Sequence, residues 1–347
     1  MMHNEQDALR FPWPEAPEPG VPVEVAPGIL WVRFPLPFRL DHVNIYLIAD
    51  GDGWAVVDTG ISDDVTREAW GALLNGPLAG QPLTRLIVTH FHPDHIGLAG
   101  WLCAEFGIPL LTSQTSFLMC NVISLTPGAA EAKPYRDFYL RHGMDAETAQ
   151  MVSTQGHQYL QMVAPLPPTF LRLLSGDTLT IGGRQFRVYS GDGHAPEQIM
   201  LYLPEEKILL AADQVIARIT PNISVWAVDP DGDPLGHYLR TTRTLESHVP
   251  EDTLVLPGHE LPFYGLAERC RQIVNHHEDR CRMITEACAD GPKSVAELVP
   301  VVFQRPLDPH QLSFAFSETH AHVNRLIRRG ELAWIERNGG VACVLAK

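Results

Sequence analysis

The chain has 347 residues, of which 45% are hydrophobic and 19% are charged, a balance that allows a globular protein with a sizeable core. Its formal net charge of −15 argues against general nucleic-acid binding, because a phosphate backbone is held mainly by Lys and Arg. A small anionic substrate is not excluded, since bound divalent cations would offset part of that charge locally.

The first part of the chain predicts a sheet covered by helices. Residues 1 to about 22 are rich in Pro, Glu and Ala, and we expect an irregular arm there. Short strands separated by turn residues follow, which favours a mostly antiparallel sheet; we expect them at 23–25, 29–34, 43–48 and 54–58. The pattern then alternates, which indicates helices packed outside the sheet: a helix over 63–74 with Ser62 as N-cap, a strand over 84–88, a helix over 98–106 and a strand over 109–112.

The middle and the end of the chain differ in style. Residues 113 to about 168 predict a helical insertion, with helices over 135–142 and 146–163, that is either a lid over the site or a packing decoration. Strands are then expected at 171–174, 178–181, 184–190, 199–203, 208–212 and 254–256. The last part predicts helices over 261–289, 294–303 and 312–329, and two strands about Gly339-Gly340. This order matches a winged-helix outline.

One loop is unusually dense in metal-ligand residue types. His90, His92, Asp94 and His95 fall within six residues, directly after the apolar run Leu86-Ile87-Val88. A strand that ends in such a loop presents its imidazoles and carboxylate at one point above the sheet. Neutral imidazole nitrogen and carboxylate oxygen are ligands that zinc, iron and manganese accept. We therefore expect a metal site at this strand end.

Three later stretches each place one further ligand-type residue just past an apolar strand. They are His194 after 184–190, Asp213 after 208–212 and His259 after 254–256. Taken singly, each is better explained as a loop histidine, a helix cap or a turn residue. Their shared position at strand ends is what favours a common site.

The order of these motifs resembles the metallo-β-lactamase superfamily. The HxHxDH loop, the later Gly-His, the strand-end Asp and the final Pro-Gly-His occur in the superfamily's order, and Asp58-Thr59-Gly60 is similar to its first motif. The C-terminal part resembles the segment appended in the β-lactamase-like-protein-2 branch, near glyoxalase II. The resemblance implies a four-layer αββα fold over 23–265, with the helical insertion at about 113–168 and a winged-helix-like domain over 266–347.

The resemblance also implies a seven-ligand, two-metal site. His90, His92 and His194 would hold the first metal, Asp94, His95 and His259 the second, and Asp213 would bridge both. No thiolate is among them, so zinc is expected, with iron and manganese as alternatives. Asp58 would orient a ligand histidine without touching the metal. Relatives carry Ser-Pro-Gly after the third histidine, where this chain has Ala195-Pro196-Glu197; the acid predicts a different turn there.

The expected chemistry is hydrolysis by a hydroxide that bridges the two metals. The metals would stabilise the oxyanion that develops, and Asp94 would orient the nucleophile or pass a proton to the leaving group. The expected substrate is a small ester or thioester. Insertion residues such as Phe117, Phe138 and Met151, together with the loop 37–41, would form an apolar pocket, unless those side chains only pack the insertion.

Other functions stay open at this point. The first alternative is a ribonuclease acting on single strands, and others are a lactonase or a non-catalytic metal-containing sensor. From 266 to 347 the chain has eleven Lys and Arg against ten Asp and Glu, so the rest carries a net −16. The cluster Arg325, Arg328 and Arg329 could hold phosphate weakly, but an ordinary solvated helix end explains it better.

Cysteine usage and apolar runs bear on the cell compartment. The six cysteines include no CxxC pair, which favours buried free thiols over a disulfide framework. No apolar run approaches the roughly 18 residues that span a bilayer, and the N-terminus carries no pattern of a secretory signal. We expect a cytoplasmic protein without a membrane partner, in which a homodimer is one option.

Overall fold

The computed structural model of the protein describes residues 9–126, 133–153, 156–337 and 341–346. Its first sheet has seven strands in sequence order. The first four pair antiparallel, and the fourth to the seventh run parallel. They are β1 (Val23–Ala26), β2 (Ile29–Pro35), β3 (His42–Asp50), β4 (Gly53–Val57), β5 (Leu83–Ile87), β6 (Leu110–Thr112) and β7 (Leu171–Arg172).

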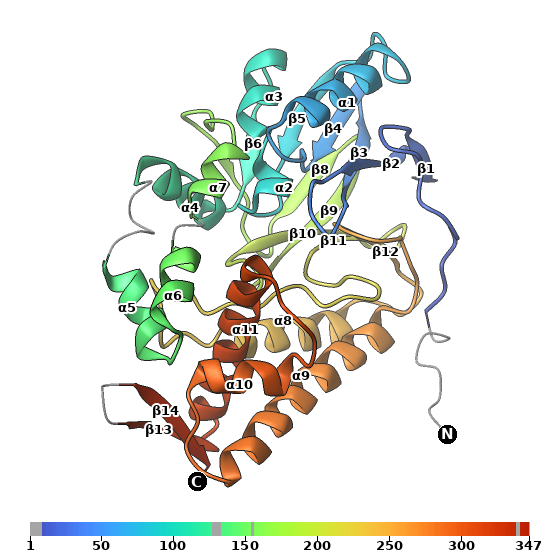
Figure 1. Ribbon diagram of the computed structural model, residues 1–347. Helices are drawn as coiled ribbons and strands as arrows, with labels where there is room; N and C mark the ends of the chain where they lie inside the picture. The colour runs from blue at the N-terminus through green and yellow to red at the C-terminus, as the bar shows by residue number, and fades with distance from the viewer. Residues whose placement is uncertain (1–8, 127–132, 154–155, 338–340, 347) are drawn as a thin grey trace.

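A second sheet of five strands faces the first (Figure 1). Its order is β12-β11-β10-β9-β8, antiparallel except for the parallel pair at the β11–β12 edge. The strands are β8 (Thr178–Ile181), β9 (Arg184–Gly191), β10 (Gln198–Leu203), β11 (Ile208–Ala212) and β12 (Leu254–Pro257). Every residue of β10, β11 and β12 is buried, as expected for strands covered on both faces.

Three apolar layers hold the sheets and helices together. Inward residues of both sheets, such as Trp31, Phe186 and Leu256, form the layer between them. The outer face of the first sheet packs on α1 (Asp64–Asn75) and α3 (Ala99–Phe106). The outer face of the second packs on α8 (Pro234–His248) and α9 (Leu266–Ala289). The result is the expected αββα arrangement of two mixed sheets flanked by helices.

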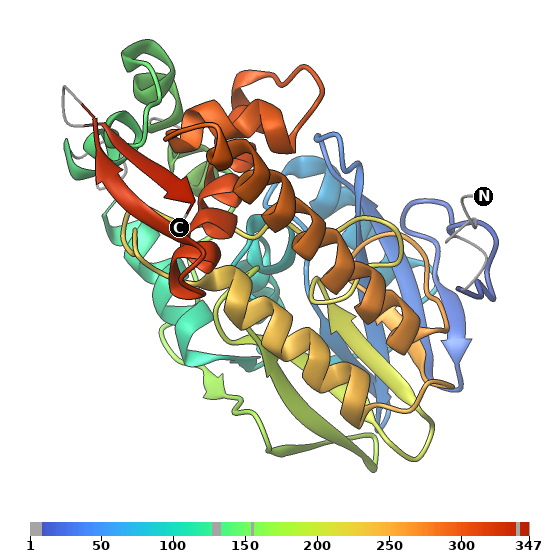
Figure 2. The same ribbon diagram turned by 90° about the horizontal axis from the view of Figure 1, so that it is seen from below.

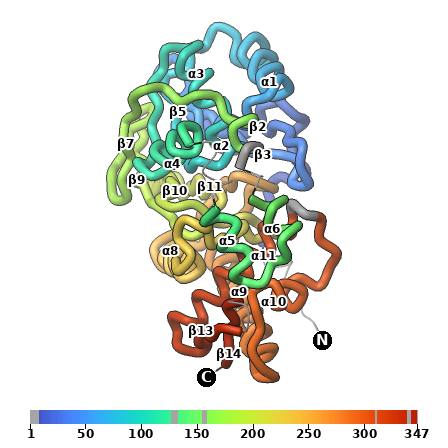
Figure 3. Tube along the Cα trace, turned by 60° about the vertical axis from the view of Figure 1, so that its left-hand side comes forward, coloured from blue at the N-terminus to red at the C-terminus, as the bar shows by residue number. Residues whose placement is uncertain are grey.

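Where it is described, at 113–126, 133–153 and from 156 on, the insertion between β6 and β7 forms four helices. They are α4 (Gln114–Leu125), α5 (Lys133–Arg141), α6 (Ala146–Ser153) and α7 (Gly156–Gln161). The helix expected over 146–163 lies partly outside the described residues, which are helical over α6 and α7. α5 and α6 lie beside the C-terminal α11, as the side view shows (Figure 3). Phe138 stacks on His320 of that helix with ring centroids 5.2 Å apart, so this aromatic residue packs the insertion.

The C-terminal part is a small unit of three helices and a hairpin. It contains α9, α10 (Val295–Val302), α11 (Pro309–Arg328) and the antiparallel pair β13 (Leu332–Glu336) and β14 (Ala342–Ala346). Figure 2 shows α9 running under the second sheet. The expected turn residues Gly339-Gly340 lie outside the described residues. The domain boundaries expected at 22/23 and 265/266 stay predictions.

Other expectations can be compared with single residues. Asp63, and not Ser62, caps α1, since its carboxylate accepts from the Thr66 N–H at 2.8 Å. α8 was missed altogether, although Asp233-Pro234 is a typical helix start. All six cysteines are free and buried, as expected. Within the part of the chain that is described, no helix is both long and apolar enough to cross a membrane.

Candidate metal centre

The seven predicted ligands come together where the strands of the two sheets end. The histidine loop follows β5 and continues into the short helix α2 (Pro93–Ile96). His194, Asp213 and His259 follow β9, β11 and β12. Gly258 lets the backbone before His259 come close to Asp213, because a Cβ at this position would lie 2.2 Å from the Asp213 Oδ1. The glycine of the Pro-Gly-His motif is thus a steric requirement of the site.

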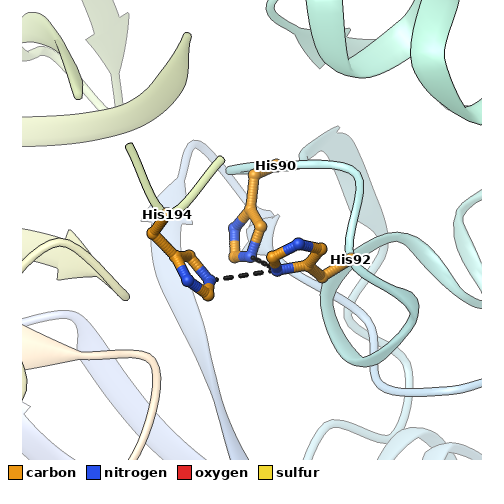
Figure 4. A group of neighbouring side chains, drawn as sticks. All are labelled: His90, His92 and His194. Atoms are coloured by element: carbon orange, nitrogen blue, oxygen red, sulfur yellow. Dashed lines mark hydrogen bonds between the residues drawn. The ribbon is translucent and has the colours of Figure 1, made fainter. Parts of the chain in front are cut away.

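The first group is a trio of imidazoles. His92 Nδ1 lies 3.0 Å from His90 Nε2 and 3.0 Å from His194 Nε2 (Figure 4). The other nitrogens of two of these rings already have partners. His194 Nδ1–H donates to the Asn222 carbonyl at 2.9 Å, so its Nε2 carries a lone pair. The Thr89 hydroxyl donates to Asp58, so it accepts from His90 Nδ1, and His90 Nε2 carries a lone pair as well.

The second group combines imidazoles with carboxylates. His259 Nδ1–H donates to the His42 carbonyl at 2.8 Å, and His95 Nδ1 contacts Asp58 Oδ2 at 2.8 Å. Nε2 is therefore, in both rings, the nitrogen that faces inward and that a cation would bind. Both Nε2 atoms face Asp94 Oδ2 at 3.3 Å from His259 and 3.5 Å from His95. Lone pairs facing carboxylates repel unless a positive charge lies between them.

Asp213 lies between the two groups. Its Oδ2 is 3.3 Å from His194 Nε2, 3.5 Å from His95 Nε2 and 3.2 Å from His259 Nε2. Its Oδ1 is buried and has no hydrogen-bond partner among the described residues, and the same holds for His95 Nε2. One carboxylate thus reaches ligand atoms of both trios.

These donors fit divalent cations. The predicted ligands fall into three overlapping sets, and within each set the ligand atoms lie within 4.8 Å of one another. The sets, which together contain all seven predicted ligands, are His90, His92 and His194; His90, His95 and Asp213; and Asp94, His95 and His259. Buried lone pairs and unpartnered carboxylate oxygens are costly without a positive charge. A nitrogen and oxygen donor set of this kind suits zinc, iron or manganese.

Proton binding shows the same demand for positive charge. Burial opposes a charge on His259, but Asp213 and Asp94 outweigh it and raise its pKa to about 10. His92 behaves in the opposite way: burial and the neighbouring His194 lower its pKa to about 3, so it is a neutral ligand at pH 7. A cation bound at the second group would therefore displace a proton from His259.

Asp58 takes the position expected for an orienting residue. It lies just past β4, is 2% exposed, and accepts from the Thr89 N–H at 2.8 Å and the Thr89 hydroxyl at 2.9 Å. Its second oxygen also meets His95. Through Thr89 and His95 a single carboxylate fixes one imidazole in each group.

The backbone is strained at three points around the site. Asp58 (φ 65°), Ala212 before Asp213 (φ 45°) and Glu260 after His259 (φ 64°) all adopt the left-handed region that non-glycine residues avoid. Each is a residue of the site or its direct neighbour. The packing of the surrounding sheets therefore offsets the backbone strain that places these side chains at the strand ends.

Glu197 stands where relatives carry glycine. It takes a φ of 51°, a left-handed region that glycine favours, and the different turn expected here stays a prediction. Its carboxylate accepts from the Thr115 N–H at 3.1 Å, and its N–H donates to Asp192 at 3.1 Å. These contacts hold the strained residue in place.

Sequence reasoning missed the groups that hold the ligands. Thr89 precedes His90 directly, so its position could have suggested a role. The carbonyls of Asn222 and His42 orient His194 and His259, yet a carbonyl leaves no signal in the sequence. Sequence patterns reveal ligand side chains more readily than backbone acceptors.

The family models agree with this geometry. Residues 38–259 match the metallo-beta-lactamase superfamily, and residues 281–343 match the metallo-beta-lactamase-like C-terminal domain. The chain belongs to the metallo-beta-lactamase superfamily. The glyoxalase II branch is not distinguished by these matches.

Similar proteins cover most of the chain. A beta-lactamase domain protein from Burkholderia ambifaria superposes with a TM-score of 0.91 at 36% identity, over 99% of this chain and 100% of that one. The probable metallo-hydrolase YqjP of Bacillus subtilis is 24% identical over 86% of this chain and 92% of its own length.

Two further relatives have named activities. A linear primary-alkylsulfatase of Pseudomonas is 24% identical over 84% of this chain and 56% of its own length. The atrochrysone carboxyl ACP thioesterase of Aspergillus fumigatus is 28% identical over 36% of this chain and 27% of its own length.

Proposed function

We propose that this metal-dependent hydrolase holds two divalent cations and cleaves small esters or thioesters. The observation that carries the proposal is the convergence of imidazole lone pairs on two adjacent points, with Asp213 Oδ2 within 3.5 Å of ligand atoms in both groups. When bound, such cations supply Lewis acidity, which lowers the pKa of water toward about 7 and neutralises charge on a developing oxyanion.

Asp94 is the residue we assign to proton handling. Its carboxylate is 19% exposed, more than those of its neighbours His95, His259 and Asp213. Burial opposes its ionisation, but His95 and His259 lower its pKa well below the ordinary value, so it is a carboxylate at neutral pH. It can therefore orient an incoming water and carry a proton toward the leaving group.

Exposed apolar side chains lie on the two segments that orient His194 and His259, which supports an acyl substrate. Ile219 and Trp226 are 39% and 45% exposed on the segment that contacts His194 through Asn222. Phe38 is 41% exposed on the loop before His42, whose carbonyl orients His259. We call these three residues the apolar rim. Exposed apolar groups beside a polar centre are typical of a binding surface for a hydrocarbon chain.

A substrate panel tests the proposal. Zinc-loaded protein should hydrolyse acyl thioesters and aryl esters, and kcat/KM should rise with acyl chain length because longer chains contact the apolar rim. Trp226→Ala should raise KM several-fold for the longest acyl chain and leave the shortest unchanged. The double substitution of His90 and His92 by Ala is the inactive control.

Alkyl sulfates are the second candidate, supported by the likeness to the linear primary-alkylsulfatase. A sulfate ester also combines an apolar chain with an anionic head near the metals. The same panel therefore includes a long primary alkyl sulfate and single-stranded RNA. Turnover of alkyl sulfate or RNA, without turnover of any carboxylic ester or thioester, would contradict the main proposal.

A further inference from the structure

Residues 213–233, which join β11 to α8, form a segment without helix or strand that we call the support segment. It begins with Asp213 and supplies, at Asn222, the carbonyl that accepts from His194 Nδ1 at 2.9 Å. A segment without its own ladder of hydrogen bonds holds a fixed shape only when its neighbours supply partners. What anchors the support segment therefore decides how His194 is aimed.

Helices of the C-terminal part supply those partners. Arg269 of α9 is buried and donates to the Ile216 and Ile219 carbonyls at 2.7 Å each. On α11, Asn324 donates to the Pro230 and Gly232 carbonyls at 2.8 and 2.9 Å. The middle of the support segment is held in the same way, through Asn222.

The anchor of Asn222 is a buried carboxylate. Its side-chain amide donates to Glu318 Oε2 and to the Phe314 carbonyl, each at 3.3 Å. Glu318 is 6% exposed, and its other oxygen forms an ion pair with Arg280 of α9. Such a pair is rigid when each partner is hydrogen-bonded further. A chain of contacts thus runs from Arg280 through Glu318 and Asn222 to His194.

Behind Glu318 lie two histidines that complete the polar cluster. His322 Nδ1–H donates to the Glu318 carbonyl at 2.7 Å, so its Nε2 accepts from His277 Nδ1 at 3.1 Å. His277, Glu318 and His322 lie close enough to hold a cation. Their own hydrogen bonds already order them, however, and the Arg280 guanidinium supplies the positive charge beside Glu318. We therefore read the cluster as a structural network.

We propose that Glu318 and Asn222 are positioning residues, through which the C-terminal helices aim His194 at the first metal. The inference rests on the proposed two-metal centre. It makes the C-terminal part a component of the metal site although it contributes no ligand. Loss of a contact between Arg280 and His194 should weaken binding of the first metal, because His194 belongs to the first trio. Binding of the second metal should not change, because His95 and His259 are oriented by Asp58 and His42.

The test measures zinc affinity by competition with a chelator, which needs no substrate. Wild-type protein should hold two zinc ions per chain. In Glu318→Gln and in Asn222→Ala, one of the two dissociation constants should rise at least about 10-fold, the range seen when an outer partner of a ligand is lost. The other should stay within about twofold. Asn222→Ala keeps the carbonyl that accepts from His194 and removes the tether to α11, together with the hydrogen bond that the Asn222 side chain accepts from the Ser224 hydroxyl.

Two further variants separate positioning from general stability. Cys281→Ala removes a buried side chain next to Arg280 without touching the contact chain, so it should lower Tm and leave both zinc affinities unchanged. The double variant Asn222→Ala/Glu318→Gln should be no weaker than the more affected single variant, because both changes break one chain.

The outcomes are distinct. Unchanged zinc affinities in folded Glu318→Gln and Asn222→Ala would overturn the inference and leave the two-metal centre standing. A third zinc in wild type, lost in Glu318→Gln, would show that the histidine cluster is a metal site and would also overturn it. Wild type that binds no zinc would instead refute the proposed function.

Discussion

Asp58 shows how much one residue can decide in this site. Its two oxygens accept from Thr89 and contact His95. Asp58 therefore determines which ring nitrogen carries the hydrogen in His95 and, through Thr89, in His90. Its left-handed backbone, with a φ of 65°, places the carboxylate between the two groups. One carboxylate thus orients, directly or through Thr89, a histidine in each of the two groups.

Asp58→Asn should weaken metal binding at the position whose histidine loses its orientation. The amide keeps one acceptor oxygen but presents an N–H₂ to either Thr89 or His95, so one imidazole loses its orientation. We expect zinc affinity and kcat/KM to fall by about 10- to 100-fold, measured by chelator competition and by ester hydrolysis. Asp50→Asn, at a carboxylate that is 11% exposed and paired with Arg85 away from the predicted ligands, is the control and should change neither. Wild-type zinc affinity in Asp58→Asn would contradict this role.

At the residue scale, the ligands could be predicted and their supports could not. His90, His92, Asp94 and His95 share one loop, and a side chain that must touch a metal leaves its type in the sequence. Asn222 aims His194 with a carbonyl, and any residue type can offer one. Glu318 is 96 positions from Asn222, a separation that no periodicity bridges.

At the scale of elements, two helical glycines differ in whether the surrounding packing leaves room for a side chain. In α3 a Cβ on Gly100 would lie 1.7 Å from the Pro165 carbonyl, so the insertion packs directly on the helix backbone. In α1 a Cβ on Gly71 would meet nothing within 4 Å. Only the first glycine is required by packing.

Substitution by alanine should separate the two glycines. Gly100→Ala should destabilise the protein by about 1–3 kcal/mol, because the chain after α7 must move away. Gly71→Ala should stabilise it by up to about 1 kcal/mol, because alanine is the better helix former. Thermal unfolding followed by circular dichroism measures both. Equal effects of the two substitutions would show that the contact with Pro165 does not constrain α3.

Most elements followed from hydrophobic periodicity, and the misses have physical reasons. The expected strands agree with the structure to within one or two residues at most ends, because buried strands read as apolar runs. α4 and α8 were missed. Gln114–Leu125 lies in the expected helical insertion but outside its two expected helices, and Pro234–His248 lies in a stretch for which no element was expected. In both cases the cap, Ser113 or Asp233, was the available signal.

At the scale of the whole molecule, the C-terminal helices are joined to the catalytic layers by buried polar groups. Arg269, Glu318 and His322 all lie in this junction, and His322 is fully buried. Burial lowers the pKa of His322 to about 3, and Arg280 acts in the same direction. His277 and His276 face it as well, and burial is again the first cause that lowers their pKa values.

The protein should therefore lose stability in mild acid. The folded state keeps His322 neutral, whereas the unfolded chain binds a proton near pH 6.5; the stabilisation is complete above pH 6.5 and is lost as the pH falls toward 3. At pH 5 protonation of this histidine in the unfolded chain should by itself lower the free energy of unfolding by about 2 kcal/mol. Urea unfolding of chelator-treated protein at pH 7 and pH 5 measures the loss without a contribution from metal. His322→Gln should show a smaller loss, and an identical loss would contradict the assignment.

The order in which the chain is synthesised gives the support segment a further consequence. All seven ligand residues leave the ribosome before Arg269, Asn324 and Glu318, which fix the segment around Asn222. The N-terminal layers can fold first, but under our inference the segment that aims His194 is complete only once α11 has emerged. We therefore expect tight uptake of the proposed first metal late in maturation, and a nascent chain that stalls before α11 should release an apoprotein with that position still loose.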